Sequence, residues 1–169
     1  NVIDIKIMIK LSNKYKKVLV TGGAGFIGGA FVRNLLKNEN IKIVNLDKLT
    51  YASDLTSINK LIKQLNQKKD ENYKFLNIDL VNKKKVEEAI FKIKPDLIVH
   101  MAAESHVDRS IQSPEIFIQS NIVGTFNLLE TSRNFWNSLS FERKKLFKFI
   151  HISTDEVFGT IDGKGSFTE

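Results

Sequence analysis

Two adjacent carboxylic acids, Asp155 and Glu156, follow an apolar run in the stretch HISTDEVFGT, residues 151–160. An elimination of water needs a base and an acid, and two neighbouring carboxyl groups can supply both if their surroundings separate their pKa values. Partial burial beside a strand end, together with repulsion from Glu156, would raise the pKa of Asp155 from its free value of ~4. A solvated turn whose carboxylates cap the next segment has the same spacing. The pair by itself leaves an acid–base site and a plain turn equally open.

A glycine-rich loop is the second feature with chemical meaning. The stretch VLVTGGAGFIGG, residues 18–29, places Gly22, Gly25 and Gly28 at G-x-x-G-x-x-G spacing and also contains G-x-G-x-x-G. Glycines let a backbone turn sharply and approach a pyrophosphate, whose charge then lies on N–H groups at the start of a helix. A tight turn that binds nothing has a similar pattern. Asp47, about 20 residues further on, favours dinucleotide binding because a carboxylate there can accept hydrogen bonds from the adenosine ribose.

The residues at the end of this second apolar run also bear on which dinucleotide is bound. The carboxylate of Asp47 would repel the 2′-phosphate of NADP, which favours NAD. The neighbouring Lys48 acts in the opposite direction. We therefore expect NAD as the cofactor, although the positive charge of Lys48 would reduce the preference for NAD over NADP.

A third cluster, HMAAESHVDRS at residues 100–110, combines two small residues with several polar ones. Its alanines at a strand end leave room for a ligand, and a solvated loop would be polar for no further reason. His106, beside acidic and basic neighbours, is more typical of a hydrogen-bonding scaffold than of a catalyst. His100 and His151 are expected to be strand-end residues.

These features need a scaffold that brings strand ends together, and the apolar pattern predicts one. Short apolar runs alternate with longer amphipathic ones, which indicates βαβ units around a parallel sheet. The expected strands are Lys17–Thr21, Ile41–Leu46, Lys74–Ile78, Leu97–Met101 and Phe147–Ser153. The chemical features lie at the carboxyl ends of these strands, the edge at which such sheets bind nucleotides. We predict an α/β fold with a Rossmann-type doubly wound parallel sheet.

Three helices are expected between the strands. The first two each present one buried stripe, at Ile27, Phe31 and Leu35 and at Val86, Ala89, Ile90 and Ile93. The third is longer and begins at Pro114, after the N-cap Ser113. It carries Ile118, Ile122, Phe126 and Leu129 on one face.

Composition excludes several other classes of protein. The formal charge of +7 invites a nucleic-acid hypothesis, but the lysines are scattered and their one tight run, residues 83–85, is followed by acids at helical spacing. No stretch approaches the ~20 apolar residues of a membrane span. The absence of cysteine excludes disulfides and thiolate sites and suits a cytoplasmic protein. We expect no nucleic-acid partner, no membrane association and no metal site.

Five motifs together resemble the extended short-chain dehydrogenase/reductase family, namely TGGAGFIGG, LDKLTYAS, HMAAESHVDRSI, FIQSNIVGT and HISTDEVFG. The resemblance runs from about Lys17 to Glu169 and leaves residues 1–16 as an N-terminal extension of uncertain role. The acidic pair is more specific than the glycine loop, because related epimerases carry small residues there and related decarboxylases tend to have Ser-Glu. Within the family, the resemblance therefore points to the enzymes that dehydrate the sugar of a nucleotide sugar at C4 to C6.

The resemblance implies a set of contacts with NAD and with the sugar nucleotide. The pyrophosphate would be held by Gly22, Gly25, Phe26, Ile27 and Gly28; the adenosine ribose by Asp47, Lys48, Leu49 and Thr50; the adenine by Asp79 and Leu80; and the nicotinamide side by Ala102, Ala103 and Ser120. Ser105 and Thr154 would contact the sugar nucleotide. Ser120 and Phe158 depart from the threonine and tyrosine usual at their positions.

The implied reaction is NAD-dependent 4,6-dehydration of dTDP-glucose, with Glu156 as the base, Asp155 as the acid and Thr154 beside them. The first step also uses the tyrosine of a Tyr-x-x-x-Lys helix, but none of the three tyrosines here has lysine four residues later. That motif, and a C-terminal substrate domain, are expected beyond Glu169. We therefore expect residues 17–169 to be an incomplete NAD-binding domain of about five strands, from a full-length homodimer, and to be inactive alone.

Three alternatives stay open at this stage. The chain could belong to a UDP-glucose 4,6-dehydratase, because no residue that recognises the base is identified. It could belong to another nucleotide-sugar enzyme of the same family. It could also be a binding module that holds NAD without catalysis, for which the missing Tyr-x-x-x-Lys is the supporting feature.

Overall fold

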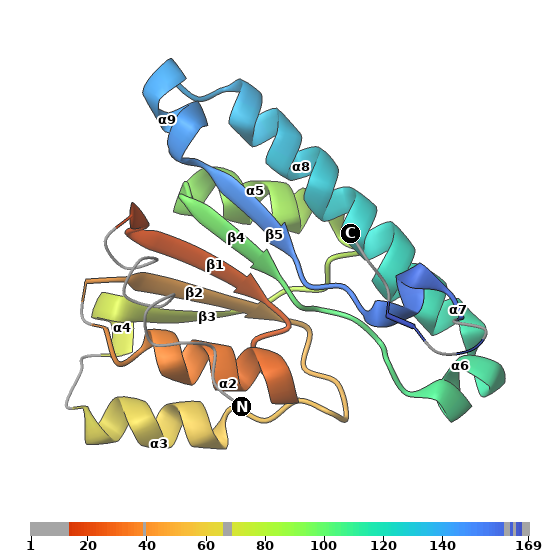
Figure 1. The fold of residues 1–169 in the computed structure, drawn as a ribbon. Coiled ribbons are helices and arrows are strands. Elements are labelled where there is room, and N and C mark those ends of the chain that lie inside the picture. The colour runs from red at the N-terminus through yellow and green to blue at the C-terminus, as the bar shows by residue number, and fades with distance from the viewer. Residues whose placement is uncertain (1–13, 39, 66–68, 161–162, 164, 167–169) are drawn as a thin grey trace.

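Five parallel strands form one sheet in the computed structural model, with helices on both of its faces (Figure 1). The structure describes residues 14–38, 40–65, 69–160, 163 and 165–166. The strands are β1 (Lys17–Thr21), β2 (Lys42–Asp47), β3 (Tyr73–Asn77), β4 (Leu97–His100) and β5 (Lys148–His151), in the order β3-β2-β1-β4-β5. The predicted fold and all five strands are confirmed. The predicted fifth strand was too long, because the regular pairing of β5 with β4 ends at His151.

Helices connect the strands and cover the two faces of the sheet. On one side lie α2 (Phe26–Leu35) and α3 (Thr56–Gln64); on the other lie α5 (Lys83–Ile93) and α8 (Thr125–Asn137) (Figure 1). The shorter elements are α4 (Lys69–Asn72), α6 (Val107–Gln112), α7 (Pro114–Phe117), the π-helix η1 (Ile118–Gly124), α9 (Phe141–Leu146) and the 3₁₀-helix η2 (Asp155–Phe158).

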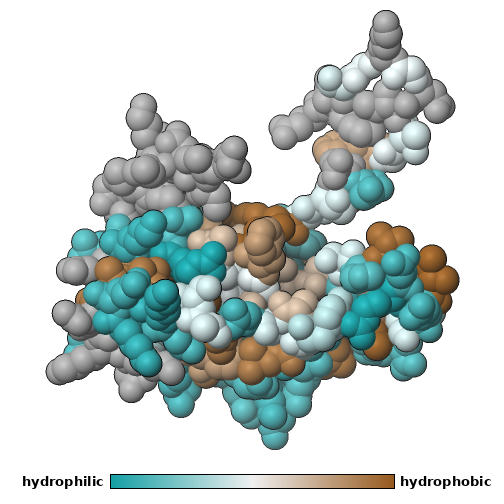
Figure 2. Space-filling view, turned by 90° about the horizontal axis from the view of Figure 1, so that it is seen from below, coloured by the Kyte–Doolittle hydropathy of each residue, from teal (hydrophilic) through white to brown (hydrophobic). Residues whose placement is uncertain are grey.

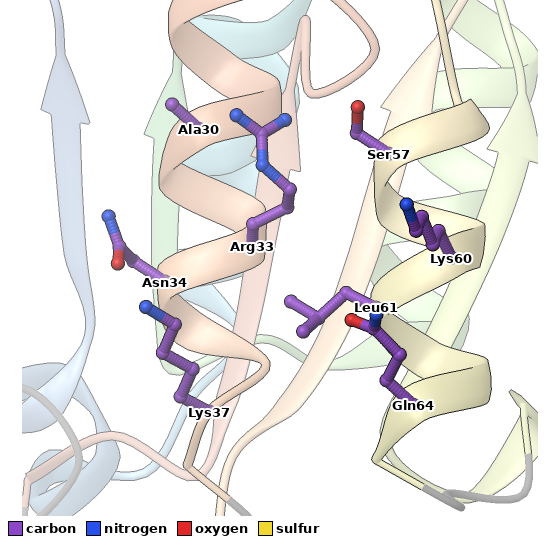
Figure 3. Close-up of a pocket in the computed structure, with 8 residues that line it drawn as sticks. All are labelled: Ala30, Arg33, Asn34, Lys37, Ser57, Lys60, Leu61 and Gln64. Carbon is purple, nitrogen blue, oxygen red and sulfur yellow. The ribbon is translucent and has the colours of Figure 1, made fainter.

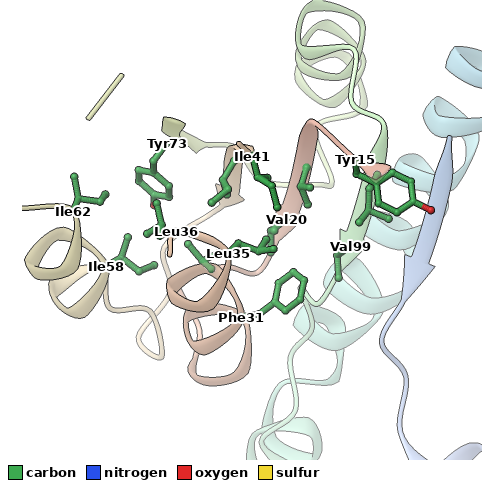
Figure 4. Close-up of a cluster of buried hydrophobic side chains, with 14 residues drawn as sticks. Tyr15, Val20, Phe31, Leu35, Leu36, Ile41, Ile58, Ile62, Tyr73 and Val99 are labelled. Carbon is green, nitrogen blue, oxygen red and sulfur yellow. The ribbon is translucent and has the colours of Figure 1, made fainter. Parts of the chain in front are cut away.

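The core divides into two layers because alternate residues of a strand face opposite sides of the sheet. Val18 and Val20 of β1 pack with Phe31 and Leu35 of α2, whereas Leu19 packs on the face covered by α5 and α8. Figure 4 shows Val20, Phe31 and Leu35 in the first of these layers. All of these side chains are almost fully buried. Covering on both faces explains why β1 and β4 read as continuous apolar runs and not as alternating ones.

The first helical stripe was predicted one turn too long. Phe31 and Leu35 are buried as expected, but Ile27 is 64% exposed. Ile27 is the second residue of α2, next to the glycine loop, and the buried face of the helix begins only at Gly28. The second stripe is confirmed, with Val86, Ala89 and Ile90 of α5 buried and Ile93 partly buried.

The single long helix predicted from Pro114 is divided into α7, the π-helix η1 and α8. The wider turns of a π-helix shift the faces of a helix relative to one another. The predicted stripe of Ile118, Ile122, Phe126 and Leu129 is exposed, by 45–63% of each side chain. The buried face of α8 is formed by other residues, among them Leu128 and Phe135.

The surface differs between the two ends of the molecule. Figure 2 shows hydrophobic surface at the end that carries α6 and α7, where Val107, Ile111 and Ile116 are exposed. A shallow cavity of about 370 Å³ lies between α2 and α3; Figure 3 shows its lining, which includes Arg33, Lys37 and Lys60.

Among the described residues, no helix combines the length and the apolar character needed to cross a membrane.

Candidate functional site

The glycine loop joins β1 to α2 at the carboxyl edge of the sheet. Gly22 has a φ of 72°, and its N–H donates to the carbonyl of Leu46, 3.0 Å away, so the loop is fixed to the end of β2. A Cβ atom on Gly22 would lie 2.6 Å from the Cα of Ala102. Glycine is therefore required here both by the left-handed backbone and by the close approach of the loop that follows β4.

The start of α2 is open to a ligand, which fits the predicted contact with a pyrophosphate. Gly25 is the N-cap residue and no side chain caps the helix. A Cβ atom on Gly28 would overlap the carbonyl oxygen of Gly22, so only glycine lets the first turn of the helix lie against the loop. Phe26 is 95% exposed. The uncapped N–H groups and the positive end of the helix dipole form a cradle for an anion.

Asp47 is buried, and the chain itself uses both of its carboxylate oxygens. Oδ2 accepts from the N–H of Ala24 at 3.0 Å, while Oδ1 accepts from the N–H of Leu49 at 2.8 Å and from Ser53 Oγ at 3.2 Å. Only 7% of the residue is exposed. Asp47 therefore connects the glycine loop to the loop after β2, a structural role that sequence analysis did not identify. Its predicted contact with the ribose would have to share these oxygens.

Lys48 and Ser120, which the resemblance assigns to opposite ends of NAD, are in direct contact. Lys48 Nζ lies 3.2 Å from Ser120 Oγ and 3.5 Å from Glu104 Oε1. The lysine side chain therefore reaches from the end of β2 to the loop after β4 and to η1. Sequence analysis placed Glu104 in a polar loop but gave it no partner.

The side chain of Asn121 also fixes the loop after β4. Asn121 of η1 accepts from the N–H of Glu104 at 2.8 Å and donates from Nδ2 to its carbonyl at 2.9 Å. This pairing reproduces the hydrogen bonds of a strand neighbour and holds the loop backbone in place. Asn121, between Ser120 and Ile122, was not predicted, because nothing in its local sequence indicates a contact with a loop that precedes it by 17 residues.

His100 ends β4 and is completely buried. Its Nδ1 lies 2.6 Å from Thr21 Oγ1 and its Nε2 lies 2.9 Å from Thr125 Oγ1, so it connects β1 with α8. Burial, with a smaller effect of His151 stacked 4.8 Å away, lowers the pKa of His100 to about 4. The imidazole is therefore neutral at neutral pH. The prediction that both histidines are strand-end residues is confirmed.

Other predicted site residues lie around this edge with different degrees of exposure. Leu80 is buried and its carbonyl accepts from Asn127 Nδ2 at 3.0 Å, while the Asp79 side chain caps a turn by accepting from the N–H of Val81. Ala102 is half-buried; Thr50 is half-buried; Leu49, Ala103, Ser105 and His106 are exposed.

The acidic pair begins the short 3₁₀-helix η2, directly after β5. The Thr154 side chain caps this helix, with its Oγ1 accepting from the N–H of Glu156 at 3.4 Å. Glu156 is exposed. The side chain of Asp155, and with it the predicted rise of its pKa, lies outside the described residues.

Comparison with known proteins gives consistent matches over nearly the whole chain. The sequence model of the family described as GDP-mannose 4,6 dehydratase matches residues 19–169. The dTDP-glucose 4,6-dehydratase of Neisseria meningitidis serogroup B is 46% identical over 155 residues, which cover 91% of this chain and 42% of that protein. The chain thus spans less than half the length of this relative.

Solved structures give the same fold. A dTDP-glucose 4,6-dehydratase from Bacillus anthracis in complex with NAD matches with a TM-score of 0.69 and 34% identity, over 91% of this chain and 42% of that one. The UDP-Glc/GlcNAc 4-epimerase of Campylobacter jejuni matches with a TM-score of 0.69 and 32% identity, over 85% and 39%. Enzymes of different activity therefore share this scaffold, and activity has to be argued from the site.

Proposed function

We propose that this chain, which belongs to the GDP-mannose 4,6-dehydratase family, is the NAD-binding part of a dTDP-glucose 4,6-dehydratase. The observation that carries the proposal is the cradle of Gly22, Gly25 and Gly28 beside the buried Asp47 at the carboxyl edge of the sheet. A relative that is 46% identical is a dTDP-glucose 4,6-dehydratase, and a similar solved structure of such an enzyme contains NAD.

The cofactor half of the proposal assigns each part of NAD to residues at this edge. The N–H groups at the start of α2 hold the pyrophosphate, with Phe26 and Ile27 in the first turn. Asp47, Lys48, Leu49 and Thr50 lie at the adenosine ribose; Asp79 and Leu80 at the adenine; Ala102, Ala103 and Ser120 on the nicotinamide side. NAD held by these residues would supply hydride transfer from the sugar and back to it.

The elimination is assigned to the residues that follow β5. Glu156 takes the proton from C5 of the sugar and Asp155 gives a proton to the departing C6 hydroxyl. The C5–H and C6–O bonds break, a C5–C6 double bond forms, and water leaves. Thr154 and Ser105 position the sugar. Glu156 is exposed here, so the bound sugar and the remainder of the full-length enzyme must cover the acidic pair. A covered pair has the separated pKa values that acid and base roles require.

Four measurements test this proposal. A calorimetric titration of the purified 169-residue chain with NAD should show saturable binding at one site. The same chain should form no 4-keto-6-deoxy sugar from dTDP-glucose, and product formation would contradict its assignment as a part of the enzyme. In a full-length protein that contains this chain, Glu156→Gln should lower kcat about 100-fold or more. UDP-glucose, tested beside dTDP-glucose, distinguishes the two nucleotide specificities.

A module that binds NAD without catalysis is the second candidate. It is favoured by the exposure of Glu156. Both candidates predict NAD binding by the chain. They differ in the full-length protein, where only the enzyme consumes dTDP-glucose.

We further propose that the full-length protein is a cytoplasmic homodimer. The exposed apolar residues Ile118, Ile122 and Phe126 extend from η1 to the first turn of α8 and provide a surface that a second copy could cover. Sedimentation equilibrium should show a dimer that Phe126→Asp weakens. An unchanged dimer in this variant would place the interface elsewhere.

A further inference from the structure

Lys48 occupies a position from which a cation could favour NADP. It directly follows Asp47 at the end of β2, where a positive side chain can neutralise the 2′-phosphate of NADP and where an acid instead favours NAD. The two neighbouring residues therefore have opposite expected effects on the choice of dinucleotide. The structure shows where the lysine charge lies.

The ammonium group of Lys48 contacts side chains of two other segments of the chain. It lies 3.5 Å from Glu104 Oε1 and 3.2 Å from Ser120 Oγ, on the loop after β4 and on η1. The Lys48 and Glu104 side chains are only 27% and 10% exposed. An ion pair with so little contact with water is screened less by salt than a surface pair.

The backbone on both sides of this ion pair is fixed. Asp47 Oδ1 accepts from the N–H of Leu49 at 2.8 Å, which sets the direction in which the Lys48 side chain leaves β2. Asn121 binds both the N–H and the carbonyl of Glu104. Arg109, another cation near the loop after β2, is itself stacked on the Tyr51 ring at 3.8 Å. The lysine and the glutamate are therefore held opposite each other by contacts that do not involve a ligand.

We propose that Glu104 is a specificity-determining residue that disfavours NADP by holding the Lys48 charge away from the 2′ position. The ammonium group is neutralised by Glu104, and the carboxylate of Asp47 acts on a 2′-phosphate without an opposing positive charge beside it. This inference rests on the proposed NAD site. The preference for NAD then depends on Lys48, which follows β2, and on Glu104, which follows β4, as well as on Asp47.

The test compares the dissociation constants of NAD and NADP in the purified 169-residue chain. Glu104→Gln keeps the shape of the side chain and releases Lys48, so NADP should bind more tightly while NAD changes little. We expect the ratio of the NADP constant to the NAD constant to fall roughly five- to tenfold, the effect of one unit charge a few ångströms from a phosphate. Glu130→Gln is the matched control, because it makes the same change of charge at the Arg133 ion pair of α8 and should leave the ratio unchanged.

A double variant separates release of Lys48 from simple loss of a negative charge. In a Lys48→Met background, Glu104→Gln should change the ratio by less than about twofold, because there is no lysine to release. An equal gain in NADP affinity in this background would overturn the inference. If Glu104→Gln does not fold, Lys48→Met alone decides: an unchanged ratio supports a neutralised lysine, and a large loss of NADP affinity overturns it.

Failure of the inference can be told apart from failure of the proposed function. If the wild-type chain binds NAD and Glu104→Gln leaves the ratio unchanged, the role of Glu104 is wrong and the NAD site stands. If the folded wild-type chain binds neither dinucleotide, the proposed NAD site is wrong and the role of Glu104 is wrong with it.

Discussion

Chemistry is assigned to two regions, which are built in opposite ways. The glycine-loop edge contains Gly22, Gly25 and Gly28 with the neighbouring strand ends, and the acidic-pair segment is η2, residues 155–158. At the glycine-loop edge, Asp47 and His100 are buried and bonded to several other elements. In the acidic-pair segment, Glu156 is exposed on a short 3₁₀-helix. The proposed binding of a dinucleotide can therefore be prepared by the sheet itself, whereas the proposed acid–base chemistry needs the pair to be covered.

The largest expected effect comes from adding one methyl group to the glycine loop. Gly28→Ala would place a methyl group on the Gly22 carbonyl oxygen, so the loop must move. We expect a loss of about 3 kcal/mol in the free energy of unfolding and no measurable NAD binding. Gly29→Ala is the control, since its methyl group would meet the flexible end of the Arg33 side chain at 3.3 Å and the Gly23 carbonyl oxygen at an ordinary contact distance of 3.6 Å. Urea unfolding and NAD titration measure both variants; equal behaviour would refute the close approach.

Acid should weaken the glycine-loop edge through His100. The unfolded chain binds a proton to this histidine near pH 6.5, but the folded chain does so only at a pKa of about 4. The contribution of His100 to the free energy of unfolding is therefore fully present above pH 6.5. It decreases by about 3 kcal/mol in total as the pH falls toward 4. The free energy of unfolding, measured from pH 7.5 to pH 4.5, should decline less steeply in His100→Gln. His106→Gln, at an exposed position, should keep the wild-type slope.

Loss of the Asp47 charge should have the next largest effect. In Asp47→Asn, the amide N–H₂ must face the N–H of either Ala24 or Leu49, so one hydrogen bond is replaced by a contact between two donors. We expect a loss of about 2 kcal/mol in the free energy of unfolding. Asp54→Asn is the control: Asp54 is exposed and its pKa is lowered chiefly by hydrogen bonds with Thr56. A chemical denaturation curve in which the two variants match would show that burial of Asp47 contributes little.

The smallest expected effect lies in the acidic-pair segment. Glu156→Ala should change the free energy of unfolding of the chain by less than about 0.5 kcal/mol and should leave NAD binding unchanged, because the side chain is exposed. Thermal unfolding with and without NAD measures both. A loss above 1 kcal/mol would mean that Glu156 supports the fold, and the contrast between the two regions would then fail.

The sequence by itself determined the sheet, the glycine loop and the family motifs. Five apolar runs gave five parallel strands, and Gly22, Gly25 and Gly28 lie at the edge where the spacing placed them. These features are local, because the period of apolar residues and the positions of glycine follow from a few neighbouring residues. The exposed stripe at Ile118 and Ile122 shows the limit of such patterns, since periodicity gives a face but does not say what covers it.

Only the tertiary structure decided which polar residues work together. The partners of Lys48 are Glu104 and Ser120, more than fifty residues away along the chain, and His100 bridges Thr21 and Thr125. Parallel strands joined by helices bring together loops that are distant in sequence, and no spacing rule relates one such loop to another. Side-chain charges at this edge are therefore paired by the order of the strands and the direction of each side chain, which the order of residues alone does not contain.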